Sequence, residues 1–262
     1  MLIDTHCHLD ATEFNGAGAQ LAQQAQQQGV QAVVIPAVCR ANFADVASLG
    51  IYGGYALGIH PLYVPTATDA DLIFLREQVE LAMADRCFVA VGEIGLDFFV
   101  PELCTPEMRD RQIYFYREQL RIAHQFDLPV LLHVRRSVDQ ILKGLRQITV
   151  PGGIAHAYNG SEQQAAMLIK LGFKLGFGGA MTYTRALQIR RLATSLPLSA
   201  IVLETDSPDI PPSWLDAESN TPQQLPRIAQ TLAQLRDLSF NDVALATSAN
   251  AHAVLPRLSK AD

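Results

Sequence analysis

Leu2-Ile3-Asp4-Thr5-His6-Cys7-His8-Leu9-Asp10 opens the chain with a short apolar run that leads directly into a His-x-His pair. Successive side chains of a β-strand point to opposite faces, so Asp4, His6 and His8 are expected to project together. Two imidazoles on one face can share a metal ion. A lone His-x-His pair is weak evidence, because many such pairs are incidental. Its meaning depends on what the rest of the chain brings to the same place.

Seven further short apolar runs, rich in β-branched residues, follow along the chain. Near-continuous apolar runs of this length are typical of strands that are buried on both faces, as in a parallel sheet. The expected strands are Leu2–His8, Gln31–Pro36, Tyr55–His60, Phe88–Glu93, Leu128–His133, Gly153–His156, Phe173–Phe177 and Ala200–Asp206.

Longer segments with a helical pattern alternate with these runs. The expected helices are Gly18–Gln28, Asp69–Asp85, Thr105–Phe126, Ser137–Gln147, Ser161–Leu171, Thr184–Ser195, Thr221–Leu235 and Ser239–Leu255. Eight strand-helix units predict an α/β fold and favour closure into a (β/α)8 TIM barrel, formed by one domain over residues 1–262. An open doubly wound sheet is the alternative. No G-x-G-x-x-G follows the first strand, which removes the usual dinucleotide-binding fingerprint.

Composition argues against several classes of protein. The 262 residues are 49% hydrophobic and 18% charged, which suits a large globular domain. The four cysteines are widely spaced and form no CxxC pair, so a reduced, cytoplasmic setting is expected. We expect no signal peptide and no membrane span, because no apolar run approaches about 20 residues. The net charge of −6 argues against a protein that coats nucleic acid, although bound cations change the local sign in a cleft.

Most of the histidines lie at or near the C-terminal end of an expected strand. These five are His6, His8, His60, His133 and His156. Active sites of TIM barrels are built at that end, from several strands. Two carboxylates end strands in the same way, Glu93 after a buried run and Asp206 before Ser207. A charged side chain in that position needs a cation or a proton.

Four histidines and two carboxylates form the expected set of metal ligands: His6, His8, Glu93, His133, His156 and Asp206. The set is rich in nitrogen and oxygen and contains no thiolate, which suits Zn, Mn or Mg. Six ligands exceed the four of a tetrahedral zinc, but they suit two divalent metal ions that share a carboxylate. Such a pair can clamp a phosphoryl group and lower the pKa of a shared water. The chain contains no G-x-S-x-G nucleophile motif and no P-loop.

Five short motifs contain most of these residues. They are Asp4-Thr-His-Cys-His-Leu-Asp10, Gly58-Ile-His-Pro61, Gly92-Glu-Ile-Gly-Leu-Asp97, His133-Val-Arg135 and Glu204-Thr-Asp-Ser-Pro208. Together they are highly specific, and on them the whole chain resembles the TatD family of metal-dependent deoxyribonucleases, within the amidohydrolase-type barrels. The resemblance implies a hydrolase of phosphodiester bonds that acts on DNA or a small phosphodiester, with two divalent metal ions and a metal-activated water.

The same resemblance implies how the metal ligands divide. His6, His8 and Asp206 would hold one metal ion. His133 and His156 would hold the other, and Glu93 would bridge the two. Asp206 would also orient or deprotonate the attacking water, so Glu93 and Asp206 are the expected catalytic residues.

Three further residues receive roles around this centre. His60, outside the six ligands, would contact or position the substrate phosphate. Arg135 lies two residues past His133 and is a candidate phosphate contact, with a salt bridge at the rim as the alternative. Glu204 shares a face with Asp206 and would support the metal ligands from behind.

The chain departs from the family pattern near the substrate rather than at the metals. The family usually has His-Cys-Phe-Ser/Thr-Gly after strand six, where this chain has His156-Ala-Tyr-Asn-Gly160. Arg136-Ser137 stand where an acidic residue and Ala often follow the strand-five Arg. Ser219-Asn-Thr-Pro222 lacks the Arg of the family's Arg-Asn-x-Pro. The choice among DNA, RNA and a small phosphodiester therefore stays open, as do the metal and the endo- or exonuclease mode.

Two other functions were weighed against this one. A hydrolase of the same barrel could cleave an amide, lactone or aminoacyl ester, but relatives in the wider superfamily often use a lysine where this chain has Glu93. A binding protein with a structural metal is disfavoured, because structural zinc sites are usually closed and rich in cysteine. No stripe of basic and aromatic residues marks a nucleic-acid groove. No obligate protein partner is evident, and a monomer is expected.

Overall fold

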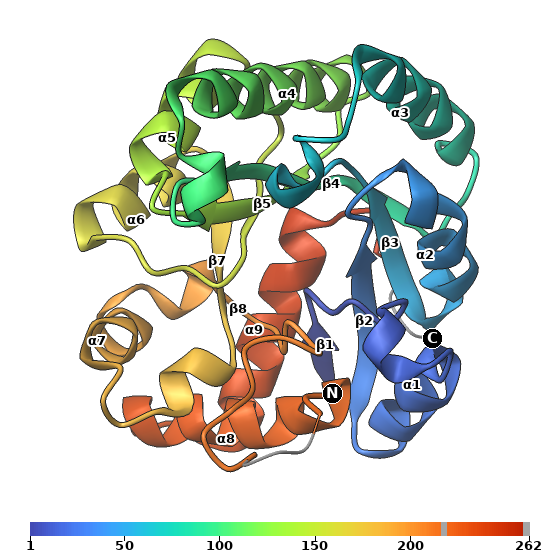
Figure 1. Cartoon of the computed structure of the whole chain (residues 1–262). Helices are drawn as coiled ribbons and strands as arrows, with labels where there is room; N and C mark the ends of the chain where they lie inside the picture. The colour runs from blue at the N-terminus through green and yellow to red at the C-terminus, as the bar shows by residue number, and fades with distance from the viewer. Residues whose placement is uncertain (216–218, 259–262) are drawn as a thin grey trace.

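Eight parallel strands form one sheet in the order of the sequence, β1 to β8, as the (β/α)8 barrel requires. The computed structural model describes residues 1–215 and 219–258. Figure 1 looks into the ring that the strands form. The strands are β1 (Leu2–Asp4), β2 (Val30–Pro36), β3 (Gly53–Leu57), β4 (Phe88–Asp97), β5 (Val130–Arg135), β6 (Gly153–Ala155), β7 (Phe173–Phe177) and β8 (Ile201–Leu203). All eight expected strands and the predicted barrel class are confirmed.

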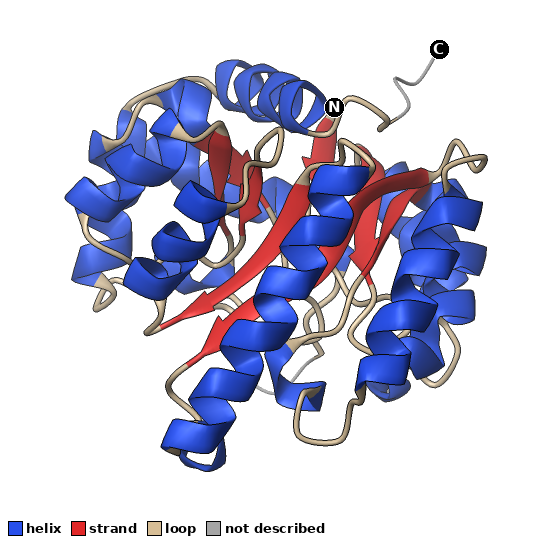
Figure 2. Cartoon of the chain, turned by 90° about the horizontal axis from the view of Figure 1, so that it is seen from above, coloured by secondary structure: helices blue, strands red, loops and turns tan. Residues whose placement is uncertain are grey.

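Helices surround the strands on the outside (Figure 2). They are α1 (Gly18–Gln27), α2 (Phe43–Leu49), α3 (Asp69–Ala82), α4 (Pro106–Gln125), α5 (Val138–Gln147), α6 (Glu162–Lys170), α7 (Leu187–Ser195), α8 (Leu225–Arg236) and α9 (Phe240–Val254). The sequence did not predict α2, whose seven residues are too few for a clear helical period. The long α4 begins with Pro106 in its first turn, and the Thr105 hydroxyl accepts a hydrogen bond from Met108 N.

Backbone hydrogen bonds join the residues that follow β1 to the end of β8 and to the segment after it. Thr5 N donates to Leu203 O at 3.0 Å, and Asp206 N donates to His6 O at 2.8 Å. The expected adjacency of the first and last strands is therefore confirmed. It brings the segment after β1 beside the segment after β8, although some 200 residues of sequence separate them.

Two clusters of buried apolar side chains form the core of the barrel. One lies between the strands and the outer helices, and Phe88, Phe115 and Phe173 are among its buried members. The other joins inward-facing strand residues such as Val34 and Val202 to α9 and the residues after it. In Figure 1, α9 is seen through the centre of the ring, where it covers one end of the barrel. The opposite end is left for the loops that follow the strands.

The expected extents of the first and last strands were wrong. β1 ends at Asp4 and β8 at Leu203, so His6, His8 and Asp206 lie in the turns that follow. β3 likewise ends at Leu57, before His60, whereas β4 continues past Glu93 to Asp97. The expectation that Asp4 projects beside His6 and His8 was also wrong. Its carboxylate instead accepts hydrogen bonds from Thr205 N at 2.9 Å and Thr205 Oγ1 at 2.6 Å. Closure of the barrel supplies these donors, which buried Asp4 needs.

The proline-rich segment from residue 207 to 222 was expected to overhang the mouth of the barrel. Pro208, Asp209 and Ile210 do line the cleft there. Residues 216–218 of this segment lie outside the described part of the chain. Among the described helices, none is both long enough and apolar enough to span a bilayer.

Candidate metal centre

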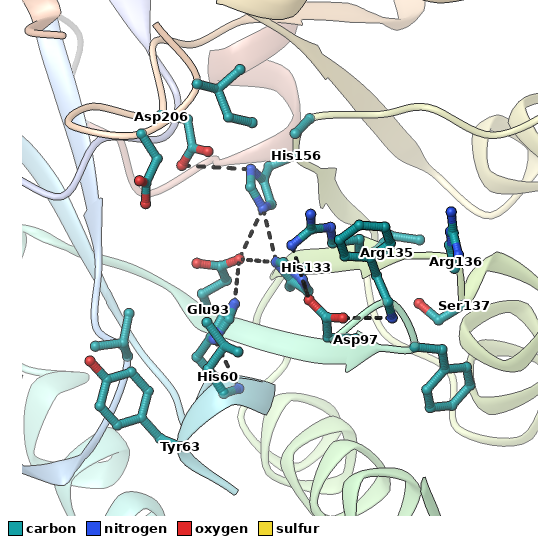
Figure 3. A pocket seen from close by; sticks show the side chains of 18 of the residues that line it. His60, Tyr63, Glu93, Asp97, His133, Arg135, Arg136, Ser137, His156 and Asp206 are labelled. Carbon is teal, nitrogen blue, oxygen red and sulfur yellow. Dashed lines mark hydrogen bonds and ion pairs between the residues drawn. The ribbon is translucent and has the colours of Figure 1, made fainter. Parts of the chain in front are cut away.

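A cleft of about 1880 Å³ opens at the C-terminal ends of the strands. Figure 3 shows the side chains that point into it. The cleft is lined by all but one of the predicted site residues: His8, His60, Glu93, His133, Arg135, His156 and Asp206. His6 is fully buried beneath them and contacts Glu93 from below the surface of the cleft. The structure therefore brings every predicted ligand to one place.

Glu93 lies at the centre of this group, and its two oxygens face different histidines. Oε2 is 3.2 Å from His6 Nε2 and 3.6 Å from His8 Nε2. Oε1 is 3.0 Å from His156 Nε2 and 3.1 Å from His133 Nδ1 (Figure 3). One carboxylate thus spans two sets of imidazoles that come from different strand ends.

Asp206 faces the set that follows β1. Its Oδ1 lies 3.6 Å from His6 Nε2, 3.8 Å from His8 Nε2 and 4.0 Å from His156 Nδ1. The two nitrogens His6 Nε2 and His8 Nε2 are themselves only 3.2 Å apart. A neutral imidazole has one acceptor nitrogen and one N–H, so hydrogen bonds alone cannot satisfy so many convergent lone pairs. A divalent cation can satisfy them, and the donor set therefore fits a metal.

The pKa shifts of Glu93 and His6 favour the forms that bind metal, whereas the shift of His156 does not. Burial alone would raise the pKa of Glu93, but the surrounding imidazoles hold that pKa well below its usual range. Burial and the neighbouring His156 lower the pKa of His6 to about 3. Burial would also lower the pKa of His156, but Glu93 and Asp206 raise it to about 10. A carboxylate and a neutral imidazole are the forms that bind metal, whereas a metal would have to displace the proton of His156.

The potential ligands form three overlapping groups. His6 with His8 and Glu93 is one, His6 with His156 and Asp206 is the second, and His60 with Glu93 and His133 is the third. These groups place His156 with His6, whereas the predicted division pairs it with His133. The division of ligands between two metals thus stays a prediction.

His60 is oriented as a hydrogen-bond donor. Leu62 N donates to its Nδ1 at 3.1 Å, so the proton of the neutral ring lies on Nε2. Nε2 faces Glu93 Oε1 at 3.4 Å. Burial lowers the pKa of His60 to about 4, which keeps the ring neutral. Because His60 also belongs to one of the three potential ligand groups, its expected place outside the six metal ligands stays a prediction.

Asp97 is a functional residue that the sequence reasoning quoted in a motif without giving it a role. Its Oδ2 lies 3.0 Å from His133 Nε2, and its Oδ1 accepts hydrogen bonds from Phe99 N and Val100 N. Burial would raise its pKa, but these hydrogen bonds lower the pKa of Asp97 to about 2. The carboxylate therefore fixes the orientation of His133. The sequence could have indicated this role, because Asp97 lies four residues after Glu93 and residues four apart in a strand share a face.

Gly95 allows β4 and β5 to bring this pair together. Its φ of 146° is accessible to glycine, and a Cβ there would collide with the carbonyl of His133. Gly95 and His133 are partners in the register of the two strands, and Asp97 pairs with Arg135.

Glu204 contacts the segment that carries His156, which suits its expected role of supporting the metal ligands. Its Oε1 accepts a hydrogen bond from Ala157 N at 2.5 Å and is 3.9 Å from His156 Nδ1. Burial raises the pKa of Glu204 to about 8. A Cβ at Gly176 would collide with this carboxyl group, so glycine makes room for it. Glu204 thereby supports the turn that carries His156.

Arg135 lies at the rim of the cleft, half exposed. Its Nη1 is 3.8 Å from Asp97 Oδ2, a long ion pair, and its guanidinium lies 3.9 Å from the centre of the Phe99 ring. Because Asp97 already binds His133 and two backbone N–H groups, it neutralises Arg135 only in part. Arg135 thus remains available to an anion in the cleft.

Comparison with known proteins agrees with the fold and the site. A sequence model of the family described as "TatD related DNase" matches residues 3–256. The uncharacterized metal-dependent hydrolase YjjV of Escherichia coli is 38% identical over 95% of this chain and 96% of its own. The crystal structure of YjjV superposes with a TM-score of 0.90 over 97% of this chain and 98% of that chain. The mouse putative deoxyribonuclease TATDN3 is 28% identical over 98% of this chain and 89% of its own.

Proposed function

Because the chain belongs to the TatD family of metal-dependent hydrolases, we propose that it cleaves phosphodiester bonds as a TatD-type deoxyribonuclease, with two divalent ions per chain. Support for DNA comes from the family description and from the name of the mouse relative. Zn, Mn and Mg all suit the donor set. The proposed location is the cytoplasm.

The observation that carries this proposal is the placement of Glu93. Its Oε2 faces His6 and His8, while its Oε1 faces His133 and His156. A carboxylate whose two oxygens face separate sets of imidazoles would suit a ligand shared by two divalent ions. A single closed structural site would not need the second set.

The chain's own residues supply the rest of the reaction. Bound divalent ions would polarise the phosphate and lower the pKa of the attacking water. Asp206 faces the same space through Oδ1 and is the proposed acceptor of the water proton. His60 Nε2–H is the proposed donor to an oxygen of the phosphate that is cut, and Arg135 is a proposed substrate contact at the rim of the cleft.

The test is a cleavage assay on single-stranded and duplex DNA oligonucleotides with Mg, Mn or Zn added to the stripped protein. We expect cleavage with at least one metal, and a loss of at least about 100-fold in Glu93→Gln. Asp139→Asn is the matched control, because Asp139 also lines the cleft but bonds to Gln164 instead of the histidines.

Absence of cleavage with every metal, or an unchanged rate in Glu93→Ala, would overturn the proposal. Parallel assays with an amide, a lactone and an aminoacyl ester test the alternative chemistry of the same barrel. Faster turnover of any of these than of the phosphodiesters would reverse the ranking.

A further inference from the structure

Two adjacent arginines at the end of β5 share one aromatic ring. The guanidinium of Arg135 lies 3.9 Å from the centre of the Phe99 ring, and that of Arg136 lies 4.6 Å from it. Figure 3 shows Arg135 beside His133 and Asp97, with Arg136 beyond it on the side away from Glu93. Stacking holds both cations in the wall of the cleft without occupying their N–H groups.

The charge of this pair is largely uncompensated. Arg135 has the long contact to Asp97 described above, and Arg136 has no carboxylate within 4.0 Å among the described residues. Both side chains are exposed to solvent. Two like charges around one ring repel each other, so an anion placed between or above them would relieve that repulsion.

The backbone around Arg136 is held in an unusual conformation. Its φ is 54°, in the left-handed region that non-glycine residues seldom adopt. The next residue is fixed, because buried Ser137 donates a hydrogen bond from Oγ to Leu96 O at 2.7 Å. A rigid and strained turn that presents a cation to a cleft is typical of a binding position.

Charge is distributed unevenly around the cleft. All three arginines that line it, Arg109, Arg135 and Arg136, lie on the side of β4, β5 and α4. The same side also carries Glu93, Asp97, Asp110 and Asp139. Glu93 and Asp97 face the histidines, and the Asp139 carboxylate accepts a hydrogen bond from Gln164. Among the described lining residues, the opposite side has no arginine or lysine.

That opposite side is acidic. It carries Asp10, Glu13, Asp45 and Asp209. An anionic substrate would be repelled there and attracted to the arginines, so the cleft sets a direction for the anionic part of the substrate.

We propose that Arg135 and Arg136, held by Phe99, form a subsite for a second phosphate of the substrate, one unit away from the bond that is cut. The inference rests on the proposed phosphodiester hydrolysis and specifies its substrate. A guanidinium pair binds phosphate through several charge-assisted hydrogen bonds.

The experiment compares two chromogenic esters that contain the same cleavable bond. One is the p-nitrophenyl ester of thymidine 5′-monophosphate, and the other carries an additional 3′-phosphate. The added phosphate is expected to lower KM about tenfold, the size of one charge-assisted contact, with little change in kcat. Arg136→Ala is expected to abolish most of this preference, and Arg136→Lys to restore part of it.

Arg185→Ala is the control, because Arg185 also lies over an aromatic ring, Tyr183, but does not line the cleft. It should leave the preference unchanged. Equal KM values for the two esters in the wild type, or an intact preference in Arg136→Ala, would overturn the subsite while leaving phosphodiester hydrolysis in place.

If neither ester is cleaved, a binding measurement decides the subsite, while the oligonucleotide assay decides the proposed function. Calorimetric titration would then compare thymidine 3′,5′-bisphosphate with thymidine 5′-monophosphate. Tighter binding of the bisphosphate that depends on Arg136 supports the subsite. Equal affinities for the two nucleotides rule it out.

Discussion

Glu93 is a buried carboxylate, and the histidines around it stabilise its charged form. It is 2% exposed, and four imidazoles hold its pKa well below the usual carboxylate range against the effect of burial. Removing the charge while keeping the shape, as in Glu93→Gln, would leave those imidazoles without their common partner. The residue is therefore expected to control metal content as well as turnover.

Asp97→Asn is expected to weaken metal binding without unfolding the protein. The amide keeps the shape of the carboxylate but loses the charge that orients His133 through Nε2. Loss of such a supporting carboxylate commonly costs about 10–100-fold in metal affinity. Metal titration followed by calorimetry measures the loss.

Asp110→Asn is the control for this substitution, since Asp110 lines the same cleft and forms no ion pair with any other described residue. A metal affinity in Asp97→Asn equal to that of the control would show that Asp97 does not position His133.

At the scale of elements, strand register places the ligands. β4 is buried over all ten residues and carries both Glu93 and Asp97 on one face. Its pairing with β5 shifts between Val91 and Ile94, and beyond that point Gly95 lies beside His133. A slip of one residue would turn every ligand of a strand to the other face, so register is as important as residue type.

The first turn of α3 offers a pH-dependent test of local stability. Thr68 donates hydrogen bonds to Asp71 Oδ2 from its N at 2.8 Å and its Oγ1 at 2.9 Å. These bonds lower the pKa of Asp71 below its usual value. A lowered carboxyl pKa stabilises the folded state above the pKa of the unfolded chain. This stabilisation is lost as the pH falls through the folded value.

Asp71→Asn is therefore expected to lower the free energy of unfolding by about 0.5–1 kcal/mol at pH 7. The difference from wild type should shrink as the pH falls below 4. Urea unfolding at several pH values measures it, with Glu77→Gln in the exposed middle of α3 as the control. A difference that does not vary with pH would contradict an electrostatic origin.

For the whole molecule, closure of the barrel makes the metal centre a link between distant parts of the chain. His6 and His8 follow β1, Asp206 follows β8, and Glu93 lies within β4. A ligand that binds only when these segments meet must stabilise the folded state by mass action.

Metal at about 100 times its dissociation constant is therefore expected to raise Tm by roughly 5–10 °C. A chelator should reverse the shift, and Glu93→Gln should abolish most of it. His124→Gln is the control, because His124 is an exposed residue of α4 and its ring contacts Thr149 O. Thermal unfolding followed by circular dichroism measures the shift, and an equal shift in Glu93→Gln would exclude this centre as its origin.

Local pattern was enough to predict the eight strands, the barrel and the set of six candidate ligands. Apolar runs report burial directly, and the ends of parallel strands meet at one end of a barrel whatever their separation in sequence. The short helix α2 was missed, and β1 and β8 were drawn too long, because periodicity in three to seven residues is ambiguous.

Only the tertiary structure decided which side chains touch. The pairing of Asp97 with His133, the turn of Asp4 toward Thr205, and the shared ring of Arg135 and Arg136 all depend on register and closure. Hydrogen bonds and stacking act over a few ångströms, whereas a sequence motif fixes position only to within a strand end. Residue type therefore determined the chemistry available to this protein, and three-dimensional packing determined how its atoms are arranged.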